Sequence, residues 1–278
     1  MNILYCGDDK IFDGLIISIL SLLKHNKEIL NIYIFTAKIT YKNKIYNPIN
    51  LKKIEILNQI VKNTNSKSCV TRIDLTYIFK HEQPTINMRS YFTPNCMLRL
   101  YADEISQIPG KILYLDADVL CNRNFSEYYH QNMENHEIVG TLDHYGKWWF
   151  HQDLRSFDYL NSGVLLLNMD LIRKTRLFAK CRQMCRTRLM FMPDQSAINK
   201  LCHTKKIVGN EYNEQHRQNN KTVFRHYSTS IHIWPVFYTL KVKPWQIDRM
   251  HTKLSDHNYD DILENYLKIK KNIVNKLS

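Results

Sequence analysis

Two aspartates one residue apart, Asp116 and Asp118, are the residues whose types and spacing point most directly to chemistry. They follow the apolar run 111–115, Lys-Ile-Leu-Tyr-Leu, which is typical of a buried strand. Ligands of open α/β sheets bind beyond the carboxyl ends of the strands, where these two carboxylates would emerge. Because they repel each other and no cationic residue separates them, a divalent cation such as Mn²⁺ or Mg²⁺ is the expected partner. The alternative is that they only cap a turn or the next helix.

The elements around this pair predict an α/β fold with a mainly parallel sheet. Residues 2–6 and 31–36 read as strands, and between them the apolar residues of 12–25 recur at helical spacing. Strand, helix and strand in this order form a βαβ unit. The first strand ends in a polar turn at Asp8, as the later strand ends at Asp116. The two acidic strand ends are therefore expected at one edge of the sheet.

The rest of the chain predicts further elements and raises two questions about single residues. The further helices are expected at 51–61, from 96, at 170–188, 193–201 and 260–278, and the further strands at 137–141 and 164–168. Arg99 stands in an apolar helical turn, so it either pairs structurally with an acid or points into the acidic pocket. Tyr145, Trp148 and Trp149 form either a core plug or a wall on which a sugar stacks.

Composition restricts the class of protein. With 278 residues the chain can form one large domain, or one domain with a smaller appendage. The net charge of +13 favours anionic partners, which include nucleic acid, an anionic membrane surface and a phosphorylated substrate. The 7 cysteines show neither CxxC pairs nor zinc spacing, which indicates free thiols and a reducing compartment. There is no apolar run long enough for a membrane span and no signal-peptide pattern, so we expect the chain to start directly with its fold.

Several stretches, taken in order, resemble glycosyltransferase family 8, which contains bacterial lipopolysaccharide and capsule galactosyl- and glucosyltransferases. The stretches that carry the resemblance are Gly7-Asp8-Asp9, 97–101, 114–118, 161–168, Asp194-Gln195, His226-Tyr227 and Lys243-Pro244-Trp245. The resemblance implies a GT-A fold, in which a mostly parallel nucleotide-binding sheet is flanked by helices and followed by a smaller helical part. We expect the catalytic domain at 1–250 and a basic amphipathic extension at 251–278.

The resemblance also implies a UDP-sugar donor, a manganese or magnesium ion, and a role for each matching residue. Asp8 matches the position that binds the uracil, and Lys243 matches the residue that meets the diphosphate. The positions assigned to donor binding are Cys6, Gly7, Asp8, Asp116, Ala117, Asp118 and Lys243. The positions assigned to the metal ion are Asp116, Asp118 and His226. The positions that line the transferred sugar, and so carry catalysis, are Arg99, Asn161, Asp194 and Gln195.

The resemblance implies transfer of a hexose from UDP to a saccharide of a bacterial surface glycan, such as lipopolysaccharide or capsule, and the residue types suit a reaction that retains the configuration of the sugar. Gln195 stands where a carboxylate nucleophile would face the anomeric carbon, which favours a front-face reaction. The chain departs from the family where residues 228–242 separate His226 from Lys243, and His232 is therefore a rival third metal ligand. Ser196 stands where some members carry a carboxylate, so galactose and glucose both stay open.

Two other functions fit parts of this pattern. A nucleic-acid-binding protein would explain the net charge, although the basic residues are spread along helices and form no recognition motif. A catalytically idle homologue is the other alternative, and the intact Asp116, Asp118 and Lys243 argue against it. Residues 260–278 read as a basic amphipathic helix that either packs on the protein or lies on an anionic membrane. We therefore expect a cytoplasmic enzyme, free or attached to the inner face of the membrane.

Overall fold

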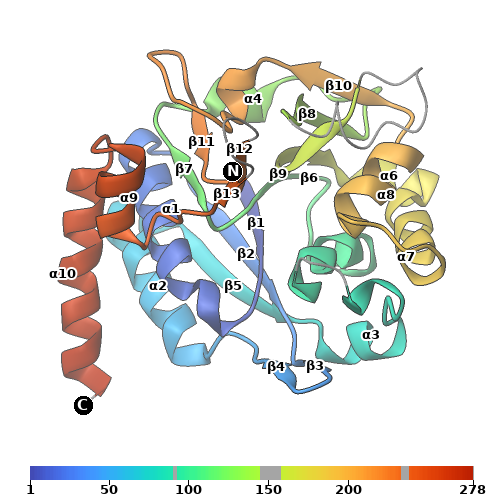
Figure 1. The fold of residues 1–278 in the computed structure, drawn as a ribbon, viewed down its shortest axis with the longest axis horizontal. Helices are drawn as coiled ribbons and strands as arrows, with labels where there is room; N and C mark the ends of the chain where they lie inside the picture. The colour runs from blue at the N-terminus through green and yellow to red at the C-terminus, as the bar shows by residue number, and fades with distance from the viewer. Residues whose placement is uncertain (90–92, 145–157, 233–237, 278) are drawn as a thin grey trace.

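A seven-stranded sheet runs through the middle of the molecule, and helices cover both of its faces (Figure 1). The computed structural model describes residues 1–89, 93–144, 158–232 and 238–277. In their order across the sheet, the strands are β10 (Lys205–Val208), β8 (Ile138–Leu142), β9 (Leu160–Asn168), β6 (Lys111–Leu115), β1 (Asn2–Cys6), β2 (Asn31–Thr36) and β5 (Cys69–Asp74). Three small sheets pair β3 (Ile39–Tyr41) with β4 (Lys44–Tyr46), β7 (Val119–Cys121) with β11 (Phe224–His226), and β12 (Ser230–His232) with β13 (Tyr238–Leu240).

The helices alternate with these strands along the chain. The α-helices are α1 (Phe12–His25), α2 (Leu51–Thr64), α3 (Thr76–His81), α4 (Ser126–His130), α6 (Met169–Thr175), α7 (Leu177–Thr187), α8 (Pro193–Leu201), α9 (Ile247–Leu254) and α10 (Asp260–Leu277). The 3-10 helices are η1 (Asp9–Ile11), η2 (Asn87–Arg89), η3 (Pro94–Glu104) and η4 (Asn210–Tyr212). The α/β fold expected from the sequence is confirmed.

The sheet is mostly parallel, and β9 is the exception. β1 pairs in parallel with β2 and with β6, β2 with β5, and β10 with β8. β9 runs antiparallel to both of its neighbours, β6 and β8. In that pairing Leu115, the last residue of β6, lies opposite Val164. The first residues of β9 therefore lie at the edge where β6 ends.

Two hydrophobic cores, one on each face of the sheet, hold the layers together. Ile3 and Tyr5 of β1 belong to the core that includes α1, α2 and α10. Leu4, between them, belongs to the other core, with η3, α7 and α8. Successive residues of a strand point to opposite faces, so both faces of β1 are covered. Each fully buried apolar side chain stabilises this arrangement by about 1.5–3 kcal/mol.

The prediction of one continuous helix at 170–188 is wrong, because the structure has two helices. Arg176 between α6 and α7 has φ 58°, a left-handed conformation that ends α6. The physical reason is the placement of the apolar residues. At about 3.6 residues per turn, Ile172 and Cys181 would lie on opposite sides of one straight helix. Both are fully buried, and the break turns α7 so that both helices face the core.

Other boundaries differ less from the expectation. The segment expected to begin a helix at 96 is a 3-10 helix over Pro94–Glu104, with Pro94 in its first turn. α2 continues past 61 to Thr64, and β9 begins at Leu160, before the expected 164. The early start of β9 follows from its pairing, because Leu160 lies opposite Leu142 of β8 across an irregularity in the ladder. Tyr145, Trp148 and Trp149 lie outside the described residues.

The C-terminal helix α10 packs along α1 (Figure 1). Ile262, Leu263 and Tyr266 are buried in the same core as α1, and Lys270 Nζ forms an ion pair with Asp13 at 2.7 Å. The apolar face of the predicted amphipathic helix is thus covered by the protein itself. No helix in the described part of the chain is long and apolar enough to span a membrane. The division of the chain at residue 250 stays a prediction.

Candidate active site

A tight turn after β6 presents the two aspartates. The Asp116 N–H donates to the Gly163 carbonyl at 2.9 Å, and the Val119 N–H donates back to the Asp116 carbonyl at 3.1 Å. The Tyr227 N–H donates to the Asp118 carbonyl at 3.0 Å, which ties the turn to the end of β11. The backbone of the turn is therefore closed by one internal hydrogen bond and tied to β9 and to the end of β11, which holds both aspartates at the edge of the sheet.

His226 completes a group of three metal-binding side chains. β11 pairs with β7, which follows the turn directly, so His226 lies opposite Val119. The His226 Nε2 lies 3.7 Å from Asp116 Oδ2 and 3.5 Å from Asp118 Oδ1. The ligand atoms of these three residues all lie within 4.8 Å of one another. Two carboxylates and an imidazole are a donor set that suits Mn²⁺ and also accommodates Mg²⁺.

Asn213 sets the orientation of the His226 ring. The His226 Nδ1 lies 3.2 Å from Asn213 Oδ1, and Asn213 Nδ2 donates to Asn161 Oδ1 at 2.9 Å. Because the Asn213 amide nitrogen already donates to Asn161, its oxygen is the atom that accepts a hydrogen bond from His226 Nδ1. Nε2 is then the nitrogen that faces the aspartates, as in sites where an outer partner fixes the orientation of a ligating histidine. The side chain of His232 lies outside the described residues.

Two cations approach the aspartates from other elements. Lys243 Nζ donates to Asp118 Oδ2 and, at 2.8 Å, to the Tyr227 carbonyl. Burial alone would raise the pKa of Asp118, but Lys243 and His226 outweigh it and hold that pKa well below its usual value. Arg99 Nη2 lies 3.1 Å from Asp116 Oδ1. The sequence showed no cation between the aspartates, and the fold supplies one for each of them.

Arg99 has both of the roles that the sequence left open: it pairs with a buried acid, and it also points to the aspartates of the candidate site. Its side chain is 2% exposed, lies over the Tyr114 ring, and forms a structural pair with Asp194 at 3.1 Å while also contacting Asp116. Arg99 Nη1 also donates to the Ser162 carbonyl. Burial would lower the pKa of Arg99, but Tyr114, Asp194 and Asp116 raise it, so the guanidinium stays charged. A single side chain thus joins η3, β6, β9 and α8.

A buried network of amides lies beside Arg99. Asn161 Nδ2 and Gln195 Nε2 both donate to Asp143 Oδ2, at 2.8 and 3.0 Å. Gln195 Oε1 in turn accepts from the Ser162 N–H at 2.9 Å and from its hydroxyl at 3.0 Å. The Gln195 amide therefore has one fixed orientation. Asp194 beside it is 4% exposed, and burial raises the pKa of its carboxyl against the opposing charge of Arg99.

The residues after β1 form the neighbouring part of the same edge. Asp8 is 5% exposed and accepts from the Lys10 N–H at 3.2 Å, and burial raises its pKa. Burial also raises the pKa of the Cys6 thiol, which lies close enough to Arg99 to feel its charge. A Cβ at Gly7 would stand 2.3 Å from Cδ1 of Ile11, so a larger residue at this turn would require the Ile11 side chain to shift. Ala117, between the two aspartates, is half-buried.

The structure therefore brings most of the sequence-based candidates into contact. The ones joined by contacts are Arg99, Asp116, Asp118, Asn161, Asp194, Gln195, His226 and Lys243. Cys6, Gly7 and Asp8 lie at the end of the adjoining strand β1. Sequence reasoning missed Asp143 and Asn213. Asp143 had a usable signal, because it follows a strand at the same edge as Asp116 does, whereas Asn213 lies in an irregular segment without one.

Residues 2–248 match the sequence profile of glycosyl transferase family 8. The chain belongs to this family. The resemblance found in the sequence is thereby confirmed over nearly the whole length of the chain. A relative from Haemophilus influenzae, named only in general terms as a glycosyltransferase, is 24% identical over 223 residues. That match covers 77% of this chain and 63% of the relative, so the chain spans less than two thirds of that protein.

Solved structures show the same fold in other family 8 and related enzymes. An active-site mutant of LgtC superimposes with a TM-score of 0.71 at 14% identity, covering 98% of this chain and 96% of LgtC. The galactosyltransferase LgtC in complex with donor and acceptor sugar analogues superimposes with a TM-score of 0.68 at 14% identity, with 96% of both chains covered. GlyE of Streptococcus pneumoniae TIGR4 superimposes with a TM-score of 0.61 at 16% identity, covering 96% of this chain and 63% of GlyE. The fold is the GT-A fold.

Proposed function

We propose that this family 8 protein is a retaining, metal-dependent glycosyltransferase that moves galactose or glucose from a UDP-sugar to a saccharide acceptor. The observation that carries the proposal is the group of Asp116, Asp118 and His226, with Lys243 beside it, at the carboxyl edge of a GT-A sheet. LgtC, which shares this fold, has been solved with donor and acceptor sugar analogues. A bacterial surface glycan such as lipopolysaccharide or capsule is the proposed acceptor.

Each part of the edge has a chemical task in this proposal. A divalent cation held by Asp116, Asp118 and His226 would act as a Lewis acid that offsets the charge of the donor diphosphate. Lys243 adds a positive charge next to the β-phosphate, where negative charge develops as UDP departs. Asp8, Gly7 and Cys6 would hold the uracil. Ala117, which lacks a long side chain, leaves room at the turn for the nucleotide.

The proposed reaction retains the configuration of the sugar. An acceptor hydroxyl oxygen forms a bond to the anomeric carbon while the bond between that carbon and the β-phosphate oxygen breaks. The bonding electrons go to the phosphate, which takes the hydroxyl proton. A second displacement would need a free carboxylate nucleophile, but Asp194 pairs with Arg99, and Asp143 accepts from Asn161 and Gln195. We assign to the amides of Asn161 and Gln195 the task of bonding sugar hydroxyls.

The proposal is tested by hydrolysis of a panel of UDP-sugars with and without Mn²⁺ and Mg²⁺. We expect slow release of UDP from one UDP-hexose in the presence of the metal, and none after chelation. UDP binding without any turnover of the panel would support the idle homologue. Salt-dependent binding of DNA without UDP binding would support the nucleic-acid-binding alternative.

We also propose that the enzyme is cytoplasmic and contacts the inner face of the membrane through α10. All seven cysteines are free, which suits a reducing compartment. Because the apolar face of α10 is buried, membrane contact would depend on its exposed lysines, Lys268 and Lys271, each of which contributes about 1 kcal/mol near an anionic surface. The double variant Lys268→Gln/Lys271→Gln should lose co-sedimentation with anionic vesicles at low salt. Equal co-sedimentation of variant and wild type would contradict this contact.

A further inference from the structure

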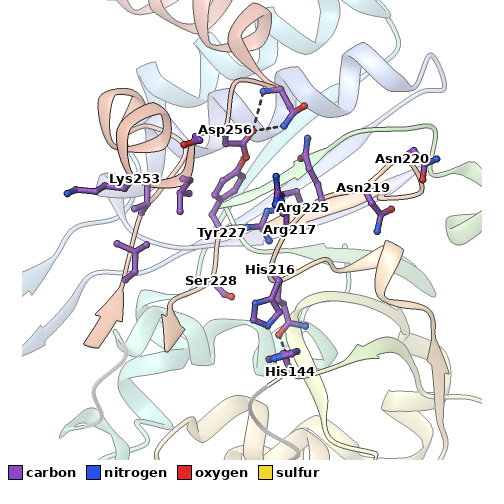
Figure 2. A pocket seen from close by; sticks show the side chains of 17 residues that line it. His144, His216, Arg217, Asn219, Asn220, Arg225, Tyr227, Ser228, Lys253 and Asp256 are labelled. Atoms are coloured by element: carbon purple, nitrogen blue, oxygen red, sulfur yellow. Dashed lines mark hydrogen bonds between the residues drawn. The ribbon is translucent and has the colours of Figure 1, made fainter. Parts of the chain in front are cut away.

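A cavity lies beside β11, and its lining includes none of the proposed metal ligands (Figure 2). Its volume is about 1070 Å³. It extends from the turn between α9 and α10, past the Arg225 and Tyr227 side chains, to His216 and His144 (Figure 2). Such a volume is ample for a ligand of several sugar rings or for a phosphorylated saccharide.

Side chains along β11 alternate in direction, and this alternation separates the cavity from the metal-binding group of Asp116, Asp118 and His226. Successive residues of a strand point to opposite sides, so Arg225 and Tyr227 point away from the side on which His226 faces the aspartates. The Arg225 guanidinium accordingly lies over the Tyr227 ring at 5.1 Å. The cavity is a distinct recess, and its ligand would not compete with a metal ion for His226.

Arg225 is a buried cation without a carboxylate partner in the part of the chain that the structure describes. It is only 7% exposed, and its guanidinium donates to the Glu214 carbonyl at 2.9 Å and lies over the Tyr227 ring. Buried arginines are ordinarily paired with acids, as Arg99 and Arg182 are here. Arg225 therefore has capacity to bind an anionic group that enters the cavity.

The rest of the lining is also positive and rich in hydrogen-bonding groups. Arg217 and Lys253 add two exposed cations at the cavity wall. Asp256 is the acidic residue of the lining, and it already accepts from the Tyr227 hydroxyl at 2.7 Å and from Asn258. Side-chain amides of Gln218, Asn219 and Asn220 also line the wall, together with the apolar side chains of Leu240, Val242 and Leu254. Cations fit phosphate or carboxylate groups, and amides fit the hydroxyls of a sugar.

One end of the cavity adjoins the proposed sugar site. His144 lines the cavity and directly follows Asp143, which holds the amides of Asn161 and Gln195. The His144 N–H donates to Gln215 Oε1 at 3.2 Å, so the wall of the cavity is bonded to the segment that carries Asp143. A ligand lying in the cavity can therefore extend one end towards the reacting sugar.

We propose that this cavity binds the acceptor, and that the acceptor is an anionic saccharide whose phosphate or carboxylate is held by Arg225, Arg217 and Lys253. The assignment of the ligand as acceptor rests on the proposed function. Charge recognition here is separate from recognition of the donor, because none of these three cations pairs with Asp116 or Asp118 in the part of the chain that the structure describes.

The test compares three sugars that differ at one carbon: glucose, glucose 6-phosphate and glucuronic acid. Binding to the full-length protein is measured by NMR titration at low salt, with UDP and Mn²⁺ binding measured on the same samples. We expect the phosphate or the carboxylate sugar to bind about tenfold tighter than glucose, because hydrogen bonds to charged groups are the stronger ones. The charged sugar whose affinity exceeds that of glucose by the larger factor identifies the anionic group that the cavity prefers.

Two matched double variants locate the effect. Arg217→Gln/Lys253→Gln removes two cations of the lining, and Lys221→Gln/Lys241→Gln removes two exposed cations nearby that do not line the cavity. We expect the first pair to lose most of the preference for the charged sugar and the second pair to keep it. Arg225→Gln should abolish the preference. Arg225 is buried, so this variant can also fold poorly by loss of its contacts. The variant of Arg217 and Lys253, which are both exposed, tests the cavity independently of such a defect.

Three outcomes would overturn the inference. If UDP binds and the lining variants keep the full preference, the cavity is not the charge-reading site, while the proposed function stands. If inorganic phosphate binds as tightly as glucose 6-phosphate, the cavity recognises an anion and no saccharide. If charged sugars bind but UDP and Mn²⁺ do not, the cavity is not an acceptor site and the proposed function fails with it.

Discussion

The backbone of Gly163 lies directly against the imidazole of His226. A Cβ at Gly163 would stand 2.2 Å from His226 Cε1 and 2.5 Å from Nδ1. The first residues of β9 thus leave just enough space for the ring that faces Asp116 and Asp118. The Asn-Ser-Gly sequence at 161–163 therefore serves the proposed metal site as well as the proposed sugar site.

Gly163→Ala should displace the His226 ring and weaken metal-dependent UDP binding by about 10–100-fold, which is typical when the support of a ligating residue is lost. Overpacking should also lower the free energy of unfolding by about 1–3 kcal/mol. Calorimetric titration with UDP and Mn²⁺ measures the first effect and thermal unfolding the second. Gly140→Ala is the control, since its Cβ would press on Leu165 in the core instead. A normal metal requirement in Gly163→Ala would show that His226 is not a ligand.

Arg99→Met should lower the free energy of unfolding by about 3–5 kcal/mol, because it leaves Asp194 and Asp116 without their buried cation. It should also weaken UDP binding, since Asp116 loses a contact that orients it. Arg182→Met is matched to it, because Arg182 is a buried arginine that pairs with Asp103 and Glu104 away from the candidate site. Denaturant unfolding should show similar losses in both variants, whereas UDP binding should fall only in Arg99→Met. Equal UDP binding in the two would make Arg99 purely structural.

Much of this site could be predicted from the sequence, and the features that could not be predicted were missed for physical reasons. Asp116 could be placed because an apolar run ending in polar residues marks the end of a buried strand. The direction of β9 could not be predicted, because the apolar run 164–167 reads the same in both directions and only the pairing of the strand with β6 and β8 decides. The break at Arg176 was missed because an arginine in the left-handed conformation has no sequence signal comparable to glycine.

Asp8→Asn should make the protein more stable at neutral pH, because burial raises the pKa of the Asp8 carboxyl above its ordinary 3.8. Well below pH 3.8 the carboxyl is protonated in both the folded and the unfolded states, and the variant has no advantage. As the pH rises, the unfolded chain ionises first, so wild type loses stability until the pH passes the raised pKa of the folded state. Urea unfolding across this pH range measures the difference.

The same variant should bind UDP about tenfold more weakly if Asp8 holds the uracil. Asp9→Asn provides the control, because the neighbouring Asp9 pairs with Lys53 at 2.6 Å and should gain no stability at neutral pH. A loss of stability in Asp8→Asn at pH 7, together with unchanged UDP affinity, would place this carboxyl outside the nucleotide site.

Gln195→Ala should lower turnover by about 100-fold while changing UDP affinity little, because a small displacement of the reacting sugar lowers the reaction rate strongly. The variant also removes the acceptor of the Ser162 N–H, so the folded fraction has to be measured. Asn199→Ala controls for that effect, because Asn199 lies one turn later on α8 and also bonds the start of β9, at Leu160. A matching loss of UDP affinity in Gln195→Ala would mean that Gln195 contacts the nucleotide.

The most direct test of the account is calorimetric titration of UDP into wild type and Asp118→Asn, each with Mn²⁺ and with excess chelator. Asp118 belongs to the proposed metal site and also faces Lys243. Wild type should bind UDP at least tenfold more tightly with Mn²⁺ than with chelator, and Asp118→Asn should bind weakly and equally in both, with its fold intact. UDP binding by wild type that is unaffected by chelator, or an undiminished manganese dependence in Asp118→Asn, would contradict a metal ion held by this carboxylate pair.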